Sequence, residues 1–139
     1  MKIYEVPGKL EVYWRQDVKA IWDKWLNYAV SLDEFCEGIM VKGLQHAKTN
    51  KAIAWIADGS DAKAVFSHEI QDYIASDVFR TFVSIGVKYF ISVEPKSALA
   101  KLGVKRYESQ VGPHGLQLVV TASLDNAIAF LVEQAKKTA

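Results

Sequence analysis

The sequence predicts a single α/β domain over residues 1–139, with a mixed, mainly parallel sheet of about five strands and about four flanking helices. Three observations predict this class. From residue 52 onward, apolar runs and amphipathic segments alternate as strand, helix, strand, helix, strand, helix, which is typical of parallel strands covered by helices. Residues 1–30 instead predict an antiparallel start, and residues 31–139 carry the alternating elements. No linker or repeat divides the 139 residues, a length that fits one domain.

The first 30 residues are rich in aromatic and β-branched residues, which favour strands. Turn residues at Pro7-Gly8 and Gln16-Asp17 divide this segment into short strands. For residues 18–26 a strand and a helix both stay open, because the tryptophans of this stretch also fit a helical spacing.

A helix is predicted after Ser31. Ser31 and Glu34 have the spacing of a capping box, in which the serine hydroxyl accepts from the Glu34 amide while the glutamate reaches back. Apolar residues then recur at helical spacing and predict one buried stripe: Leu32, Phe35, Cys36, Ile39, Met40, Leu44 and Ala47. Gly38 and Gly43 weaken a helix, so they indicate close packing against a neighbouring element.

Alternating units fill the rest of the chain. The apolar run AIAWIA at residues 52–57 predicts a central strand that is covered on both faces. Ser67 is predicted to cap the helix that follows, and Gly86 to end it. Residues 87–93 predict the next strand.

Two further helices and one strand complete the predicted order. Pro95 is expected to open a helix whose inner face carries Ala98, Leu99 and Leu102. Residues 116–121 predict the last strand, and Ser123 is expected to cap the final helix.

The composition narrows the classes of function. Lys and Arg number 17 and Asp and Glu 16, so the net charge of +1 argues against a dedicated nucleic-acid surface. The single cysteine, Cys36, has no internal disulfide partner, which fits a reducing compartment. Glu5 and Pro7 stand where a signal peptide needs its apolar core, and no apolar run reaches the length of a membrane-spanning helix. These features predict a soluble cytoplasmic protein.

The sequence lacks the local motifs of the common catalytic sites. The glycine patterns of phosphate-binding and dinucleotide-binding loops are absent. The carboxylates of the stretch Asp58-Gly59-Ser60-Asp61 would repel a phosphate, so we interpret it as a polar turn at the end of a strand. His46, His68 and His114 lie far apart without the spacing of metal ligands, and neither a metal nor a cofactor is predicted.

Four stretches in order resemble the small bacterial STAS-like proteins, relatives in fold of the anti-sigma-factor antagonist domain that are also grouped with Sec14-type folds. They are WLNYAVSLDEFCEG (25–38), AWIADGSDAKAVFSHEIQDYI (54–74), GVKYFISVEP (86–95) and LVVTASLDNAIAFL (118–131). The resemblance covers roughly residues 18–134. It implies a mixed sheet with helices on its flanks.

The resemblance also implies a candidate regulatory site. In antagonists of this fold, a serine at the start of the helix after the central strand is phosphorylated, which turns partner binding off. Ser67 stands at the matching helix start, and Ser60 lies in the loop before it. The usual Asp-Ser-Ser-Gly is absent, since the chain reads Phe66-Ser67-His68-Glu69.

Three hypotheses of function follow. The leading one is a non-enzymatic, STAS-like regulatory module that binds a partner protein or small ligand through the loop 58–68, with Asp58, Ser60 and Ser67. The alternative is a carrier of a lipid or small apolar molecule, with a pocket lined by Trp55, Phe79 and Phe82. The last is a small hydrolase that uses Asp58 with His68 or His114. An exposed aromatic patch on residues 13–28 would favour a homodimer.

Overall fold

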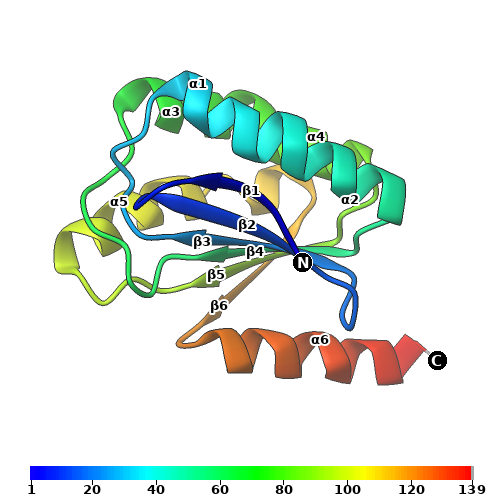
Figure 1. Cartoon of the computed structure of the whole chain (residues 1–139). Helices are drawn as coiled ribbons and strands as arrows, with labels where there is room; N and C mark the ends of the chain where they lie inside the picture. The colour runs from blue at the N-terminus through cyan, green and yellow to red at the C-terminus, as the bar shows by residue number, and fades with distance from the viewer. Residues whose placement is uncertain (139) are drawn as a thin grey trace.

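A six-stranded mixed sheet forms the centre of the protein in a computed structural model that describes residues 1–138. The strands lie side by side in chain order (Figure 1): β1 (Lys2–Val6), β2 (Leu10–Arg15), β3 (Ala20–Trp25), β4 (Ala54–Asp58), β5 (Tyr89–Val93) and β6 (Gln117–Thr121). Strands β1, β2 and β3 pair antiparallel, whereas β3 to β6 pair parallel. The predicted fold class is therefore confirmed.

The sheet has six strands, close to the expected number of about five, and the segments on either side of Pro7-Gly8 pair as β1 and β2, as the turn residues predict. Residues 20–25, for which a helix also stayed open, form strand β3. Its side chains alternate between the two faces of the sheet, and the pairing with β2 on one side and β4 on the other fixes their direction.

Three helical segments cover one face of the sheet, the first face. One runs from β3 to β4 as α1 (Leu32–Phe35), a π-helical stretch η1 (Cys36–Gly43) and α2 (Leu44–Asn50). Another joins β4 to β5 as α3 (His68–Tyr73), a π-helical stretch η2 (Ile74–Val78) and α4 (Phe79–Ser84). The third, α5 (Ala98–Glu108), precedes a short 3-10 turn η3 (Gly112–His114). Right-handed crossovers between strands in sequential order put all three segments on one side.

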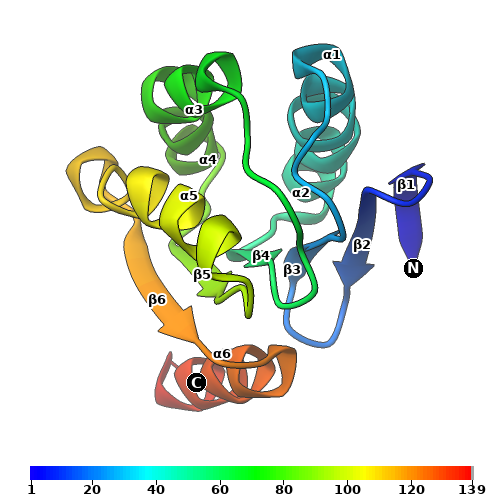
Figure 2. The ribbon, with the colours of Figure 1, turned by 90° about the vertical axis from the view of Figure 1, so that its left-hand side faces the viewer.

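Among the helices of residues 1–138, the second face is covered by α6 (Leu124–Thr138), which packs against β5 and β6 (Figure 2). The core on this side consists of small and aliphatic residues: Val18, Ala20, Ala54, Ile56, Ile91, Val93, Ala127 and Leu131. Within residues 1–138, no helix combines the length and the apolar character that crossing a membrane requires.

The helix starts agree with the predicted caps. The Ser31 hydroxyl accepts from the Glu34 amide at 3.0 Å, and the Glu34 carboxylate accepts from the Ser31 amide at 2.9 Å, which completes the capping box. Ser67 accepts from the Ile70 amide at 3.2 Å. Ser123 accepts from the Asn126 amide at 3.1 Å. Each cap satisfies an amide that the helix itself leaves free.

Gly38 and Gly43 allow the first helical segment to approach the sheet closely, as predicted. A Cβ atom on Gly38 would lie 3.0 Å from the side chains of Tyr4 and Leu10. A Cβ atom on Gly43 would lie 3.1 Å from the indole of Trp55. Any larger residue at these two positions therefore pushes the helix away from β1, β2 and β4.

The predicted inner face of α5 is wrong. Leu99 and Leu102 are 59 % and 66 % exposed, whereas Ala100, Val104 and Tyr107 face the sheet. The helix starts at Ala98 rather than at Pro95, and Ser97 caps it by accepting from the Ala100 amide at 3.4 Å. This start rotates the buried stripe to positions 100, 104 and 107, which follow the helical period.

Candidate functional site: a cavity around Asp23

Asp23 is a carboxylate in the middle of strand β3 that points into the protein core. Strand alternation places it on the first face together with Ile21 and Trp25, and only 3 % of its surface is exposed. A carboxylate removed from water costs several kcal/mol unless partners replace the hydration. The surroundings of Asp23 therefore define the site.

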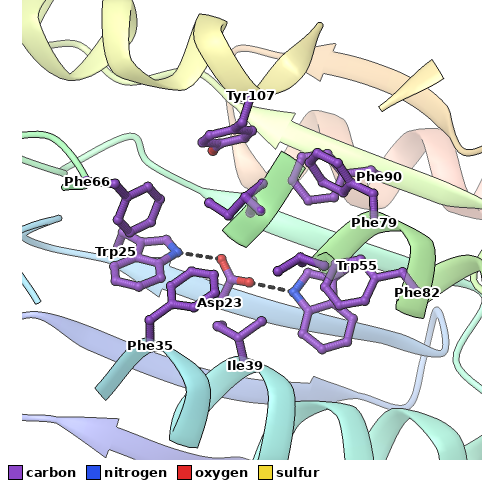
Figure 3. A pocket seen from close by; sticks show the side chains of 13 residues that line it. Asp23, Trp25, Phe35, Ile39, Trp55, Phe66, Phe79, Phe82, Phe90 and Tyr107 are labelled. Carbon is purple, nitrogen blue, oxygen red and sulfur yellow. Dashed lines mark hydrogen bonds between the residues drawn. The ribbon is translucent and has the colours of Figure 1, made fainter. Parts of the chain in front are cut away.

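Two indole groups hold the carboxylate (Figure 3). Trp25 donates its Nε1–H to Asp23 Oδ1 at 2.8 Å, and Trp55 donates its Nε1–H to Asp23 Oδ2 at 2.5 Å. Trp25 lies two residues further along β3, on the same face. Trp55 lies on the neighbouring strand β4, where it pairs with Ile21 in the register. The sheet thus places Asp23 between the two indoles, with one indole bonded to each carboxylate oxygen.

Burial raises the pKa of Asp23 from 3.8 to about 7. Removal from water is the largest cause; the hydrogen bonds from the two indoles act in the opposite direction, and the nearby Asp58 carboxylate raises the pKa further. None of the ion pairs within residues 1–138 involves Asp23. When ionised, this carboxylate is thus held by the two indole N–H groups, with no cation paired to it among the described residues.

A cavity lies directly against Asp23, between the first face of the sheet and the helices above it. We call it the aromatic cavity; the sheet contributes Asp23, Trp25, Trp55, Ala57 and Phe90, and Phe66 comes from the loop between β4 and α3. The helices contribute Phe35, Ile39, Ile74, Val78, Phe79, Phe82 and Tyr107. The volume of the cavity, counted as the space open to the centre of a water-sized sphere, is about 30 Å³. Each lining residue is at most 8 % exposed. The space is thus internal, and its wall is almost entirely apolar.

Aromatic rings around the cavity pack in pairs. Trp55 stacks on Phe82 with ring centres 4.0 Å apart, and Phe79 meets Phe90 edge to face at 5.0 Å. Phe66 meets Trp25 edge to face at 4.9 Å. Such pairs hold the rings rigidly. The cavity therefore has a defined shape around its single carboxylate.

Both long helical segments change to π-helical geometry beside the cavity. Ile39 of η1 and Ile74 and Val78 of η2 line it. π-Helical stretches are rare and occur frequently at functional sites, because the wider turn re-aims side chains that a regular helix would direct elsewhere. Two such stretches beside one cavity favour a functional site at this position.

A second polar group of the wall is the hydroxyl of Tyr107, which shares a hydrogen bond with Tyr28. Burial raises the pKa of both tyrosines, so both hydroxyls stay neutral. Two other buried atoms, Ser92 Oγ and Glu108 Oε2, have no hydrogen-bond partner among the described residues. Neither residue lines the cavity.

The residues predicted for the loop 58–68 lie elsewhere. Asp58 points to the second face, where its Oδ2 accepts from the Trp22 indole at 3.1 Å. Its Oδ1 accepts from the amide and the hydroxyl of Ser60 at 3.0 and 2.7 Å, which closes a turn. Ser67 is exposed and its hydroxyl is engaged as the cap of α3. Asp58 and Ser60 are thus brought together, while Ser67 is bonded separately.

The residues predicted for an apolar pocket converge. Trp55, Phe79 and Phe82 all line the aromatic cavity, although they come from β4 and α4. Sequence reasoning missed Asp23. A signal was present: Asp23 stands between two tryptophans in the stretch Trp22-Asp23-Lys24-Trp25, where a buried strand position is occupied by an acid.

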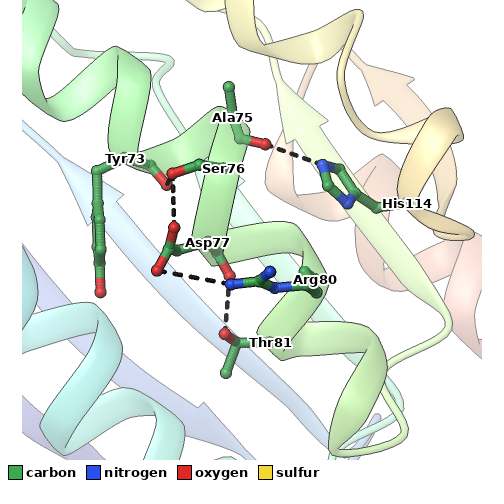
Figure 4. Close-up of polar contacts among 7 residues, drawn as sticks. All are labelled: Tyr73, Ala75, Ser76, Asp77, Arg80, Thr81 and His114. Atoms are coloured by element: carbon green, nitrogen blue, oxygen red, sulfur yellow. Dashed lines mark hydrogen bonds and ion pairs between the residues drawn. The ribbon is translucent and has the colours of Figure 1, made fainter.

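The three groups of the hydrolase hypothesis do not form a site. His114 lies with its Nε2 2.9 Å from the Ala75 carbonyl oxygen (Figure 4) and packs near Phe79 on the first face, whereas Asp58 points to the second. His68 is exposed at the start of α3. Among residues 1–138, no group of three acidic, histidine or cysteine side chains is arranged to hold a metal ion.

A polar cluster on the outer side of η2 and α4 is also visible in Figure 4. Asp77 accepts from the Ser76 hydroxyl at 2.6 Å and lies 3.8 Å from Arg80, and the Thr81 hydroxyl donates to the Asp77 carbonyl at 2.7 Å. These contacts join residues one to four positions apart on one helical segment. They account for the cluster as local helix stabilisation.

The chain matches no family model, no curated protein and no solved structure. The geometry of the site is therefore the basis for assigning a function.

Proposed function

We propose that this protein is a non-enzymatic binding module that takes a small, mainly apolar ligand into the aromatic cavity. The observation that carries the proposal is an internal cavity walled by aromatic rings with one buried carboxylate at its floor. Concave, largely apolar sites with few polar groups are the usual form of small-molecule binding sites. A protein optimised for stability alone would fill such a space and place an apolar residue at position 23.

Ligand entry requires a movement, because every lining residue is nearly covered. Phe66 belongs to the loop between β4 and α3, whereas the other lining residues stand on strands or helical segments. Backbone hydrogen bonds from Tyr28 N to Lys63 O at 2.9 Å and from Lys63 N to Leu26 O at 3.1 Å tie this loop down. A loop held by few backbone hydrogen bonds opens at a lower free-energy cost than a helix or strand. We therefore propose that the ligand enters when this loop moves Phe66 away from the cavity.

A titration with isobutanol, a small neutral probe, tests the proposal by nuclear magnetic resonance. The four indole N–H signals serve as reporters: Trp25 and Trp55 bond to Asp23 at the cavity, whereas Trp14 and Trp22 bond to Gln16 and Asp58 outside it. We expect saturable shifts of the Trp25 and Trp55 signals only. If all four signals move in parallel, or none moves, the cavity does not bind the probe and the proposal fails.

A second proposal retains the loop 58–68 as a partner-binding surface of a STAS-like regulatory module. The mixed sheet with flanking helices agrees with what that resemblance implies, and Ser67 is exposed. A phosphate on Ser67 would lie at the start of α3, next to its free amides. The intact mass of protein purified from its host should then show one phosphoryl group, which is absent in Ser67→Ala and retained in Ser60→Ala. An intact mass equal to that of the unmodified chain would contradict the proposed phosphorylation of Ser67.

A cytoplasmic location and a homodimer also stay predictions. The candidate dimer surface is reduced to Tyr13 and Trp22, which stack at 4.7 Å on the second face, because Trp14, Trp25 and Tyr28 are buried in the monomer. Sedimentation of the wild type and of Trp22→Ala tests this. A mass of one chain for the wild type would end the dimer hypothesis.

A further inference from the structure

We propose that the ligand of the aromatic cavity is a small organic cation, an alkylammonium whose charged nitrogen lies against the Asp23 carboxylate. This inference rests on the proposed binding function and adds the chemical class of the ligand. Three features of the cavity support it: an unpaired buried charge, a wall of aromatic rings, and a small volume.

The first support is the charge. Asp23 is 97 % buried and receives one indole N–H on each oxygen, yet two carboxylate oxygens accept about four hydrogen bonds. Capacity for further donors therefore remains on a group that touches the cavity. An ammonium supplies both donors and the positive charge that a buried carboxylate lacks here. A ligand carboxylate or phosphate would instead be repelled.

The second support is the wall. Trp25 and Trp55 flank Asp23, and phenyl rings such as Phe35, Phe66 and Phe82 complete the surroundings (Figure 3). The negative face of an aromatic ring attracts a cation within about 6 Å in the absence of water. Because both indoles turn their N–H edges to Asp23, this attraction is assigned to the phenyl rings. An aromatic cage with an acid at its floor is suited to a cation that carries apolar groups, because the rings contact both parts.

The third support is the size. The volume of the cavity that the centre of a water-sized sphere can occupy is about 30 Å³. One water molecule needs about 10–15 Å³ of such volume. The space therefore accepts a compact head group with a few carbon atoms. A long-chain lipid, the other apolar ligand that the sequence predicts, would require the helices to separate.

The protonation of Asp23 makes the inference dependent on pH. The titratable groups that face Asp23 from the first face are the neutral hydroxyls of Tyr28 and Tyr107, and the other helix residues of the cavity wall are apolar. The Asp58 carboxylate points to the second face and acts on Asp23 through its charge alone. With a pKa of about 7, Asp23 is ionised at about pH 8 and protonated at about pH 5. An alkylammonium, with a pKa near that of lysine at about 10, stays charged at both values. Its binding should therefore weaken as the pH falls through about 7.

Three probes of the same shape test the ligand class: isobutylammonium, isobutanol and isobutyrate, titrated at about pH 8 with the Trp25 and Trp55 indole signals as reporters. We expect isobutylammonium to bind at least about tenfold more tightly than isobutanol, and isobutyrate not to bind. In Asp23→Asn, which keeps the shape of the side chain without its charge, the two bound probes should have similar affinities. At about pH 5 the wild type should lose about tenfold in affinity for isobutylammonium only.

The outcomes separate the two proposals. If no probe shifts the reporters, the binding function fails, and the ligand class with it. If isobutanol binds the wild type as tightly as isobutylammonium, the cavity binds small molecules but the cation is wrong. The same conclusion follows if Asp23→Asn keeps the preference for the cation. Should that variant not fold, the wild type decides: an isobutylammonium affinity equal at about pH 8 and pH 5 overturns the inference.

Discussion

The two faces of the sheet differ in the residues that they bury and in how completely the space between these residues is filled. The second face, under α6, buries small and aliphatic side chains such as Ala54, Ile56 and Ile91, each 0 % exposed. The first face buries large aromatic residues, leaves a cavity among them, and turns an aspartate into it. The same strands supply side chains to both faces, so the strand propensity of these segments does not explain the difference.

The two buried aspartates sharpen the contrast. Asp58 ends β4, and the turn after it supplies two donors from Ser60 besides the indole of Trp22. Asp23 lies within β3, where its donors among residues 1–138 are the two indoles, and none of the ion pairs of this part of the chain includes it. A carboxylate at a strand end is a common turn device, whereas one in a strand centre costs stability. The second kind indicates a function.

The largest expected effect is the loss of a pH dependence in Asp23→Asn. Because the folded state raises the pKa of Asp23 from 3.8 to about 7, it binds this proton more tightly than the unfolded chain does. The contribution of Asp23 to stability thus falls as the pH rises from about 4 to about 7 and is constant above, a change of about 4 kcal/mol at most. Relative to Asp23→Asn, the wild type should become less stable over this range in urea unfolding. Parallel pH profiles would contradict the unpaired charge.

The second effect tests the tightly packed face. Ile91→Ala should lower the free energy of unfolding by about 3 kcal/mol, because it opens a hole in a filled core under α6. The indole signals of Trp25 and Trp55 and their response to isobutanol should stay unchanged. Val132→Ala on α6, 42 % exposed, is the control and should change stability by less than about 0.5 kcal/mol. A loss below about 1 kcal/mol for Ile91→Ala would mean that the second face is also loosely packed.

The smallest effect separates the two aspartates. Trp22→Phe removes one donor from Asp58, which keeps the amide and the hydroxyl of Ser60. We expect a loss of about 1 kcal/mol in the free energy of unfolding. The difference in pH profile between the wild type and Asp23→Asn should persist in this background. If Trp22→Phe abolishes that difference, the two carboxylates act as one coupled group.

Much of the fold is predictable from local patterns. The alternation after residue 52, the serine caps and the close approach at Gly38 and Gly43 are short-range signals, and the structure agrees with each. The inner face of α5 was not predictable in the same way, because moving the helix start from Pro95 to Ala98 rotates the whole stripe. Leu99 and Leu102 are apolar but exposed as a result.

The site depends on register, which no local pattern contains. Trp55, Phe79 and Phe82 are identifiable as core aromatics, and their meeting around one space follows from the pairing of β4 and the packing of α4. Asp23 was missed because residues 18–26 fit both a strand and a helix. Only a strand in this register turns its carboxylate toward the indole of Trp55, 32 residues away.

The most direct test of the account is the titration of the Asp23 carboxyl carbon by nuclear magnetic resonance, with and without isobutylammonium. The midpoint should lie near 7 in the free protein, and the indole signals of Trp25 and Trp55, but not that of Trp22, should follow the same titration. Saturating isobutylammonium should lower this midpoint, because a bound cation favours the carboxylate. A midpoint near 3.8 that the probe does not move would contradict both the buried charge and its role in binding.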